Sequence, residues 1–260
     1  MRPGRAAARV LAAFSLSLGA LAANPAAPPA AIQALRVEML TERIAKLHAQ
    51  AGQGILGGRS RRELAQALHD LDAAIATLTP PPQDREARDS WALLAILGAG
   101  YRDWAERPPT RESARRLRGR AEELAWVASK LARVEADRSR GPARGDAVRA
   151  LTAAILAERI AKARLWMRWE AGDVPLEREL RESNENLHRL LASLHEAPVQ
   201  PDEAADAIRD AEVQLGFLDD AQRELDTKRS SPRAAEFVAK ASDHIAESME
   251  RAAAAYDAVR

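Results

Sequence analysis

Two arginines, Arg43 and Arg159, hold the same place in a pentapeptide that the chain spells twice. Residues 42–46 and residues 158–162 both read Glu-Arg-Ile-Ala-Lys. If the two guanidinium groups converge, they form a site for a small anion or carboxylate, because a guanidinium binds a carboxylate through two parallel hydrogen bonds. The alternative is that each arginine pairs with an acidic neighbour, within the repeated Glu-Arg pair or on a following helix. Both arginines are therefore candidate ligand-binding residues, and both interpretations stay open.

The other reactive residue types do not form the patterns that enzymes or metal sites need. A di-iron bundle needs two Glu-x-x-His motifs and further carboxylates, and the chain has one such motif, Glu185–His188. There is no cysteine, no serine in a glycine-rich elbow, and no strand before the glycine-rich segment 52–58. We therefore predict no catalytic residue, metal or cofactor, and no enzymatic activity. Trp166 and Trp169 could line a pocket, but core or interface positions are the more common use of such side chains.

The surroundings of the two pentapeptides also repeat. Residues 32–50 match residues 148–166 at a constant offset of 116 residues, the same as from Arg43 to Arg159. After each copy come a glycine-containing break, a leucine-patterned segment, a proline-marked break and two further apolar-patterned segments. A repeat of this length that stays in register indicates an internal duplication.

The elements that must position these residues are helices. Aromatic residues make up 4% of the chain and charged residues 30%, which favours helices over sheets. Apolar residues recur at spacings of three and four, as in the series Leu64, Leu68, Leu71, Ile75 and Leu78. Amphipathic helices with short connections bury their stripes against one another. We therefore predict an all-α protein of eight helices, arranged as two tandem antiparallel four-helix bundles.

The breaks between patterned segments give the expected domain organisation. Ser60 and Glu63 have the spacing of a capping box at the start of the second helix. The segment around residues 139–145 is the best boundary between the two halves, because it is rich in Gly, Pro and Arg. The predicted organisation is a signal peptide at 1–22, a linker at 23–30, a first unit at 31–138, a linker at 139–145 and a second unit at 146–260.

The N-terminus has the parts of a secretory signal. A basic start precedes an apolar stretch at residues 10–22, with small residues at Ala20 and Ala22. We predict cleavage after Ala22; an uncleaved anchor is the weaker alternative, because the stretch is short for a bilayer. The absence of cysteine excludes disulfides and a lipoprotein cysteine. The mature chain is therefore expected to be soluble, periplasmic and not inserted in a membrane. Its near-neutral charge gives no electrostatic argument for a nucleic-acid partner.

The two motif segments resemble one known family. LRVEMLTERIAK and LTAAILAERIAK, each followed by three further helical segments, are similar to the PilJ/NarX-type sensory domain. That domain is found in type IV pili methyl-accepting chemotaxis transducers and in nitrate/nitrite sensor kinases. The matching positions are Met39, Leu40, Arg43, Ile44, Ala45 and Lys46 in the first copy, and Leu156, Arg159, Ile160, Ala161 and Lys162 in the second.

The resemblance implies a periplasmic four-helix bundle that senses a small ligand, in the nitrate sensors through arginines that meet across a dimer interface of first helices. Arg36 matches the Gly-Arg pair of the chemotaxis version and is a third candidate ligand-binding residue; the second copy has Thr152 there. The arginine that precedes the family's methionine is replaced by Glu38 in the first copy and by Ala154 in the second. An acidic side chain at that position would repel nitrate.

These observations support two hypotheses of different classes. In the first, the copies pack first helix to first helix with Arg43 and Arg159 near the internal twofold axis. The protein is then a sensory module that binds a small anion or carboxylate and passes its state to a membrane-bound signalling protein. The alternative is a structural or adaptor protein that binds another protein through its helical faces, its ligand site having decayed. A sensory module should show a polar-lined pocket between helices, and an adaptor an exposed apolar patch.

Overall fold

The described residues fold into α-helices joined by short breaks. The structure, a computed structural model, describes residues 29–78, 84–137, 142–170, 174–198, 200–228 and 231–259. Eight helices follow one another within them: α1 (Ala30–Gln53), α2 (Gly57–Thr77), α3 (Arg85–Ala105), α4 (Arg111–Ala136), α5 (Pro142–Trp169), α6 (Val174–His195), α7 (Asp202–Thr227) and α8 (Pro232–Ala258). The predicted all-α class is confirmed. The predicted signal peptide at 1–22 lies outside the described residues, as does most of the linker at 23–30.

Capping residues explain where several helices begin and end. Gly54 follows α1 with a φ of 71°, the left-handed conformation that glycine adopts without strain. Thr110 and Ser113 form a reciprocal capping box that starts α4. Ser231 caps α8, whose first turn contains Pro232. Local capping contacts therefore account for three of the predicted breaks, after α1 and before α4 and α8.

The second helix starts earlier than the sequence predicted. α2 begins at Gly57, so that Ser60 lies inside the helix, where it is fully buried. The Ser60 hydroxyl donates a hydrogen bond to the carbonyl oxygen of Ile55 at 2.5 Å, and Glu63 pairs with Arg59. The predicted capping box at Ser60 and Glu63 is wrong, because the tight turn after α1 opens the helix before Ser60 is reached.

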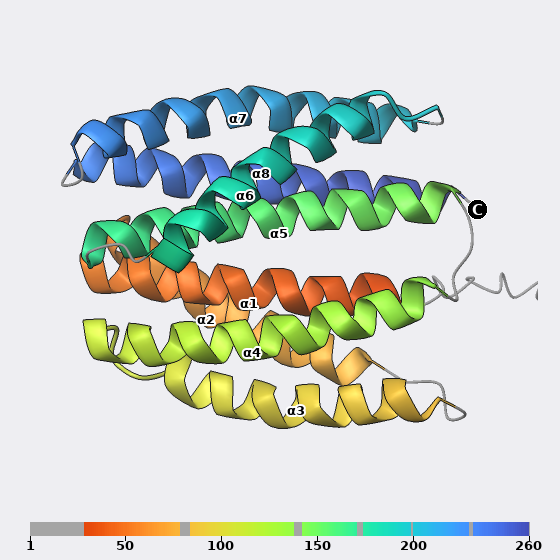
Figure 1. Ribbon diagram of the computed structural model, residues 1–260, viewed down its shortest axis with the longest axis horizontal. Coiled ribbons are helices and arrows are strands. Elements are labelled where there is room, and N and C mark those ends of the chain that lie inside the picture. The colour runs from red at the N-terminus through yellow and green to blue at the C-terminus, as the bar shows by residue number, and fades with distance from the viewer. Residues whose placement is uncertain are drawn as a thin grey trace, which may run out of the picture.

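Each half of the chain forms a unit of four helices. In the first unit α1 packs against α2 and α4, and α3 packs against α4. In the second unit the equivalent helices do the same: α5 packs against α6 and α8, and α7 packs against α8 (Figure 1). The helix contacts therefore repeat, as expected for two copies of one arrangement.

The positions that each unit buries also repeat. Leu71 of α2 and Leu187 of α6 stand at the same offset as the two pentapeptides, and both are buried. The fourth helices bury residues at the same spacing of seven, namely Leu117, Leu124 and Leu131 in α4, and Val238, Ile245 and Ala252 in α8. The duplicated sequence pattern thus corresponds to a duplicated core.

The two units are joined through their first helices. α1 packs against α5, and buried residues from both halves belong to one continuous hydrophobic cluster (Figure 1). α5 begins at Pro142, inside the segment 139–145 that was assigned to the linker. The connection between the units is therefore short, and the two first helices lie at the centre of the molecule.

Candidate functional site

The two copies of the pentapeptide meet where α1 and α5 pack side by side (Figure 1). α1 is enclosed by α2, α4 and α5, and nearly every residue from Ala31 to Ala51 is buried. A helix that is buried on all sides must find partners for its charged side chains inside the protein, because an unpaired buried charge is very costly. The packing of first helix on first helix agrees with the sequence hypothesis.

Glu158 of the second copy holds the arginine and the lysine of the first. Its Oε1 accepts a hydrogen bond from the Nε of Arg43 at 2.7 Å, and its Oε2 lies 2.5 Å from the Nζ of Lys46. The side chains of Glu158 and Lys46 are fully buried. Charge-assisted hydrogen bonds of this kind are stronger than neutral ones.

Glu42 of the first copy makes the equivalent contacts with the arginine and the lysine of the second copy. Its Oε1 accepts a hydrogen bond from the Nε of Arg159 at 2.8 Å, and its Oε2 lies 2.6 Å from the Nζ of Lys162. The pentapeptide therefore encodes a self-complementary set of ion pairs, in which the glutamate of each copy serves the arginine and lysine of the other. We call this set the charged junction: Glu42, Arg43, Lys46, Glu158, Arg159 and Lys162.

Further carboxylates surround the charged junction, and they come from different helices in the two halves. Lys46 also pairs with Asp243 of α8, whereas Lys162 lies 3.3 Å from Glu179 of α6. The central ion pairs thus follow the repeat, but the outer ones do not. The two halves are related by an approximate rather than a complete symmetry.

The candidate residues Arg43 and Arg159 come together at the charged junction, but neither is left without a carboxylate. Arg43 lies 3.8 Å from Glu250 in addition to Glu158, and Arg159 donates to Glu38 at 3.0 Å in addition to Glu42. Arg36 lies at the edge, half exposed, with its guanidinium 3.7 Å from Glu250. The acidic-neighbour interpretation thus describes the arrangement, with partners from the opposite copy. An anion at the centre would have to displace one of these carboxylates.

In the charged junction, Glu42, Lys46 and Lys162 have pKa values shifted toward their charged forms. Burial by itself raises the pKa of Glu42, but Lys162 and Arg159 outweigh it and lower that pKa to about 2. Burial by itself lowers the pKa of Lys46, yet Asp243 and Glu158 produce a net rise in the pKa. The pKa of Lys162 rises in the same way beside Glu42 and Glu179, against the effect of burial. Glu42, Lys46 and Lys162 are therefore charged at neutral pH.

Glu38 behaves differently from these residues. Burial raises the pKa of Glu38 to about 7, and the nearby charge of Arg159 only partly offsets this effect. The side chain is 9% exposed. At neutral pH the carboxyl group of Glu38 is therefore divided between its neutral and charged forms, beside the charged junction.

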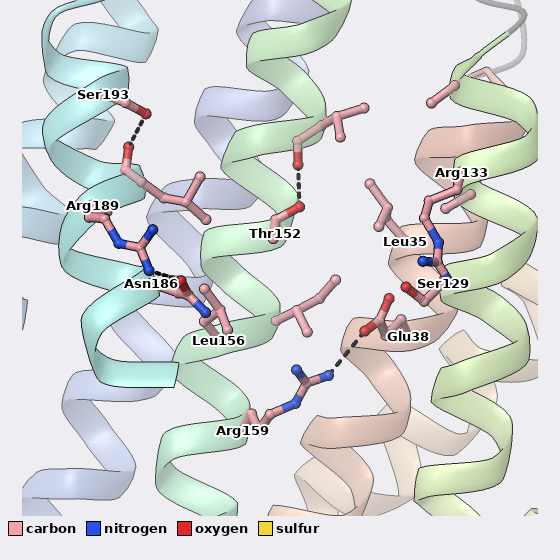
Figure 2. A pocket seen from close by; sticks show the side chains of 15 residues that line it. Leu35, Glu38, Ser129, Arg133, Thr152, Leu156, Arg159, Asn186, Arg189 and Ser193 are labelled. Atoms are coloured by element: carbon pink, nitrogen blue, oxygen red, sulfur yellow. Dashed lines mark hydrogen bonds and ion pairs between the residues drawn. The ribbon is translucent and has the colours of Figure 1, made fainter. Parts of the chain in front are cut away.

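An open cleft of about 760 Å³ lies beside the charged junction, between the two units. Its walls come from α1 and α4 of the first unit and from α5 and α6 of the second (Figure 2). Its apolar lining consists of Leu35, Ala132, Ala136, Val148, Ile155, Leu156 and Leu190, and its polar lining of Glu38, Ser129, Arg133, Thr152, Arg159, Asn186, Arg189 and Ser193. We call it the inter-unit cleft. Its volume falls within the range of roughly 300–1,000 Å³ typical of ligand sites.

A smaller cleft of about 360 Å³ occupies the position that the repeat relates to the first one. It lies between α1, α2 and α8, and Arg43 takes the place that Arg159 has in the inter-unit cleft. Its charged lining residues are Arg36, Arg43, Asp70 and Glu250. The two clefts have therefore diverged in both size and charge.

Sequence reasoning missed Arg133 and Arg189, which face the inter-unit cleft from α4 and α6 (Figure 2). No local pattern marks either residue, because the two helices belong to different units. It also missed the partnership of Glu42 and Glu158 with the opposite copy. The identity of the two pentapeptides was the available signal, since a self-complementary contact requires the same residue types on both sides.

The remaining residues that were singled out have structural roles. Trp166 is buried in the core, and its ring meets that of Trp169 edge to face at 6.0 Å, which confirms the predicted core placement. His188 of the single Glu-x-x-His motif pairs with Asp219 of α7 at 3.2 Å. Within the described ranges no group of three or more His, Asp or Glu side chains is arranged to hold a metal ion.

Comparisons with known proteins do not identify the chain. The sequence matches no protein-family model and no curated protein, and the structure matches no solved structure. Among the helices that the structure describes, none is long and apolar enough to cross a membrane.

Proposed function

We propose that this protein is a periplasmic, non-enzymatic sensory module that binds a small molecule between its units and passes the bound state to a membrane-bound signalling protein. One observation supports this most directly: Glu38 both lines the inter-unit cleft and accepts a hydrogen bond from Arg159. Arg159 in turn holds Glu42 of the charged junction. A ligand in the cleft therefore contacts side chains that help fix α1 against α5.

Signalling of this kind requires two arrangements of α1 and α5 that bind the ligand with different affinity. The charged junction offers the means, because its cations have more than one carboxylate within reach. Arg159 lies 3.0 Å from Glu38 and 3.8 Å from Glu179, in addition to its bond with Glu42. A change of partner among these carboxylates would keep the buried charge paired while the helices shift. Such exchange avoids the cost of an unpaired charge.

The test is a thermal-unfolding screen of small anions, carboxylates and amino acids. A ligand at about one hundred times its Kd should raise the unfolding free energy by roughly 2.7 kcal/mol. The screen is repeated with Ser193→Trp and with Ala136→Trp, which fill the cleft from opposite walls, after circular dichroism has verified their helicity. A ligand that stabilises the natural protein but neither filled variant supports the proposal. Equal stabilisation of all three proteins would place the ligand elsewhere and refute the proposed site.

The adaptor function keeps one specific observation in its favour. Trp126 is 60% exposed and Leu93 is 43% exposed, and both line a groove of about 380 Å³ between α3 and α4. An exposed tryptophan beside a leucine is typical of protein-binding surfaces. Proximity labelling in cells, with the natural protein and with Trp126→Ser, tests this function. An adaptor requires a labelled partner that is lost in the variant, whereas identical labelling patterns would exclude this groove.

A further inference from the structure

The lining of the inter-unit cleft narrows the chemistry of its ligand; this inference rests on the proposed function for the location of the site. We infer that the cleft binds an organic anion with an apolar body, of the class of a medium-chain carboxylate. Arg133 and Arg189 provide the positive charge for the anionic group, and the leucine and isoleucine side chains between them contact the hydrocarbon. A nitrate-like inorganic ion is a poor fit to such a cleft.

The positive charge in the cleft is not balanced by the protein. Among the described residues, neither Arg133 nor Arg189 has an acidic partner, and Arg189 donates a hydrogen bond to Asn186 at 2.6 Å. Several other arginines of α4 do have an acidic partner; Arg116, for example, lies 3.1 Å from Glu112. Arg133 and Arg189 lie on the two walls of the cleft that face each other (Figure 2). An added anion would complete their pairing.

Much of the surface between these arginines is apolar. Leu35, Ile155 and Leu156 lie on α1 and α5, and each is buried yet contributes to the lining of the cleft. Water against such a surface is displaced favourably by a hydrocarbon group. The cleft is also far larger than a small inorganic ion requires. Charge selects an anion, and the apolar lining selects one that carries a hydrocarbon body.

The smaller cleft, which the repeat relates to the inter-unit cleft, lacks its unpaired arginines. Its position equivalent to Arg189 is Ala73, and its position equivalent to Asn186 is Asp70. Its two arginines are offset by two carboxylates, and its volume is about 360 Å³. The repeat therefore carries one cationic cleft and one balanced cleft. We expect one anion per chain, in the inter-unit cleft.

Calorimetric titration of the full chain with octanoate, acetate, nitrate and 1-octanol tests this inference. Octanoate should bind with a stoichiometry of one per chain. It should bind at least tenfold more tightly than acetate, because acetate lacks the hydrocarbon chain whose burial favours binding. It should also bind about tenfold more tightly than 1-octanol, which lacks the charge. Affinities of nitrate or 1-octanol that equal the octanoate affinity would overturn the inference.

Variants then locate the charge recognition. Arg133→Ala and Arg189→Ala should each weaken octanoate binding. The larger loss, about tenfold, is expected for whichever arginine contacts the carboxylate. Arg189→Lys should retain part of the affinity, because it keeps the charge but not the planar fork. Arg181→Ala is the matched control, since Arg181 is exposed on the same helix and lines none of the clefts described here. Octanoate binding that is unaffected in both alanine variants would refute the assignment.

The outcomes separate this inference from the proposed function. If octanoate fails to bind but the thermal screen finds another ligand that Ser193→Trp excludes, the ligand class is wrong and the sensory function stands. If octanoate binds as expected yet no change at the charged junction follows, the ligand class stands and the sensory function fails. Nuclear magnetic resonance of the Arg43 and Arg159 Nε–H groups reports on the junction in both cases.

Discussion

At the scale of single residues, the protein places its charges where helix packing leaves no water to solvate them. Lys46 and Glu158 have fully buried side chains, and each charge is tolerated inside the core because the other one pairs with it. Desolvation offsets much of the attraction in such pairs, so their main contribution is to define which faces of two helices meet. We therefore interpret the charged junction as the determinant of how α1 sits on α5, a role that the substitutions proposed below can test.

Glu38 makes the stability of the protein depend on pH in a direction opposite to that of Glu42. Because burial raises the pKa of Glu38 from 4.5 to about 7, the native state keeps this proton longer than the unfolded chain does. The stability that results is present below pH 4.5 and is lost as the pH rises to 7. The pKa of Glu42 is lowered from 4.5 to about 2, so its contribution is present above pH 4.5 and is lost as the pH falls toward 2.

The unfolding free energy of Glu38→Gln, relative to that of the natural protein, should therefore be higher at pH 8 than at pH 5. The expected increase is on the order of 1–3 kcal/mol, because the natural carboxyl group must ionise in a buried site over this range. Urea unfolding at both pH values measures it. Glu182→Gln, which alters an exposed carboxylate on α6, is the control and should keep a constant difference. Parallel pH profiles for Glu38→Gln and the natural protein would contradict the prediction.

At the scale of helices, α1 and α5 have a different task from the six that surround them. The outer helices bury one stripe, whereas the central pair is enclosed by neighbours along most of its length. Close approach at one end of the pair requires a glycine. A Cβ atom at Gly52 would lie 2.7 Å from the carbonyl oxygen of Pro109 and would also overlap the ring of Trp169.

Gly52→Ala should consequently destabilise the protein, although alanine is the better helix former. We expect a loss of about 1–3 kcal/mol, because the added methyl group has to displace a tryptophan ring and a backbone carbonyl. Gly119→Ala is the matched control: a Cβ atom at this exposed position of α4 meets nothing within 4 Å. It should stabilise by about 0.5–1 kcal/mol. Urea unfolding of both variants measures the effect, and a stabilising Gly52→Ala would show that the two helix ends are less closely packed.

At the scale of the whole molecule, the two units form one structural body. Buried residues of both halves belong to a single cluster, and the charged junction ties α1 to α5 at its centre. Tryptophans are present in both units, at Trp91, Trp104 and Trp126 in the first and at Trp166 and Trp169 in the second. Unfolding of either unit is therefore visible in fluorescence.

We expect the natural protein to unfold in one transition, with fluorescence and circular dichroism giving coincident curves. The double variant Glu42→Gln and Glu158→Gln should be less stable by about 3–5 kcal/mol or more, because it leaves Lys46 and Lys162 without their central partners. It should also separate the two curves, since the units lose their main polar tie. Two transitions in the natural protein would show that the units unfold separately. A double variant that unfolds as cooperatively as the natural protein would show that the charged junction is not what couples them.

The sequence by itself determined the helical class, the approximate helix positions and the presence of a repeat. These follow from local information, since apolar spacings of three and four report which face of each helix is buried, as with Leu64, Leu68 and Leu71. The prediction failed where a short-range contact overrode a local signature. The start of α2 depends on the turn after Gly54 and on the buried hydroxyl of Ser60, and the capping-box pattern contains neither.

Only the tertiary structure decided what the repeated arginines contact and where the cleft lies. The bond from Arg43 to Glu158 joins residues from opposite halves of the chain, and Arg133 and Arg189 face one cleft from separate units. Spacing along a helix constrains the neighbours of a residue within that helix, not those across an interface between helices. The pairing of charges and the shape of the cleft depend on how α1 is oriented against α5. That orientation is a property of the packed core as a whole, because every buried side chain contributes to it.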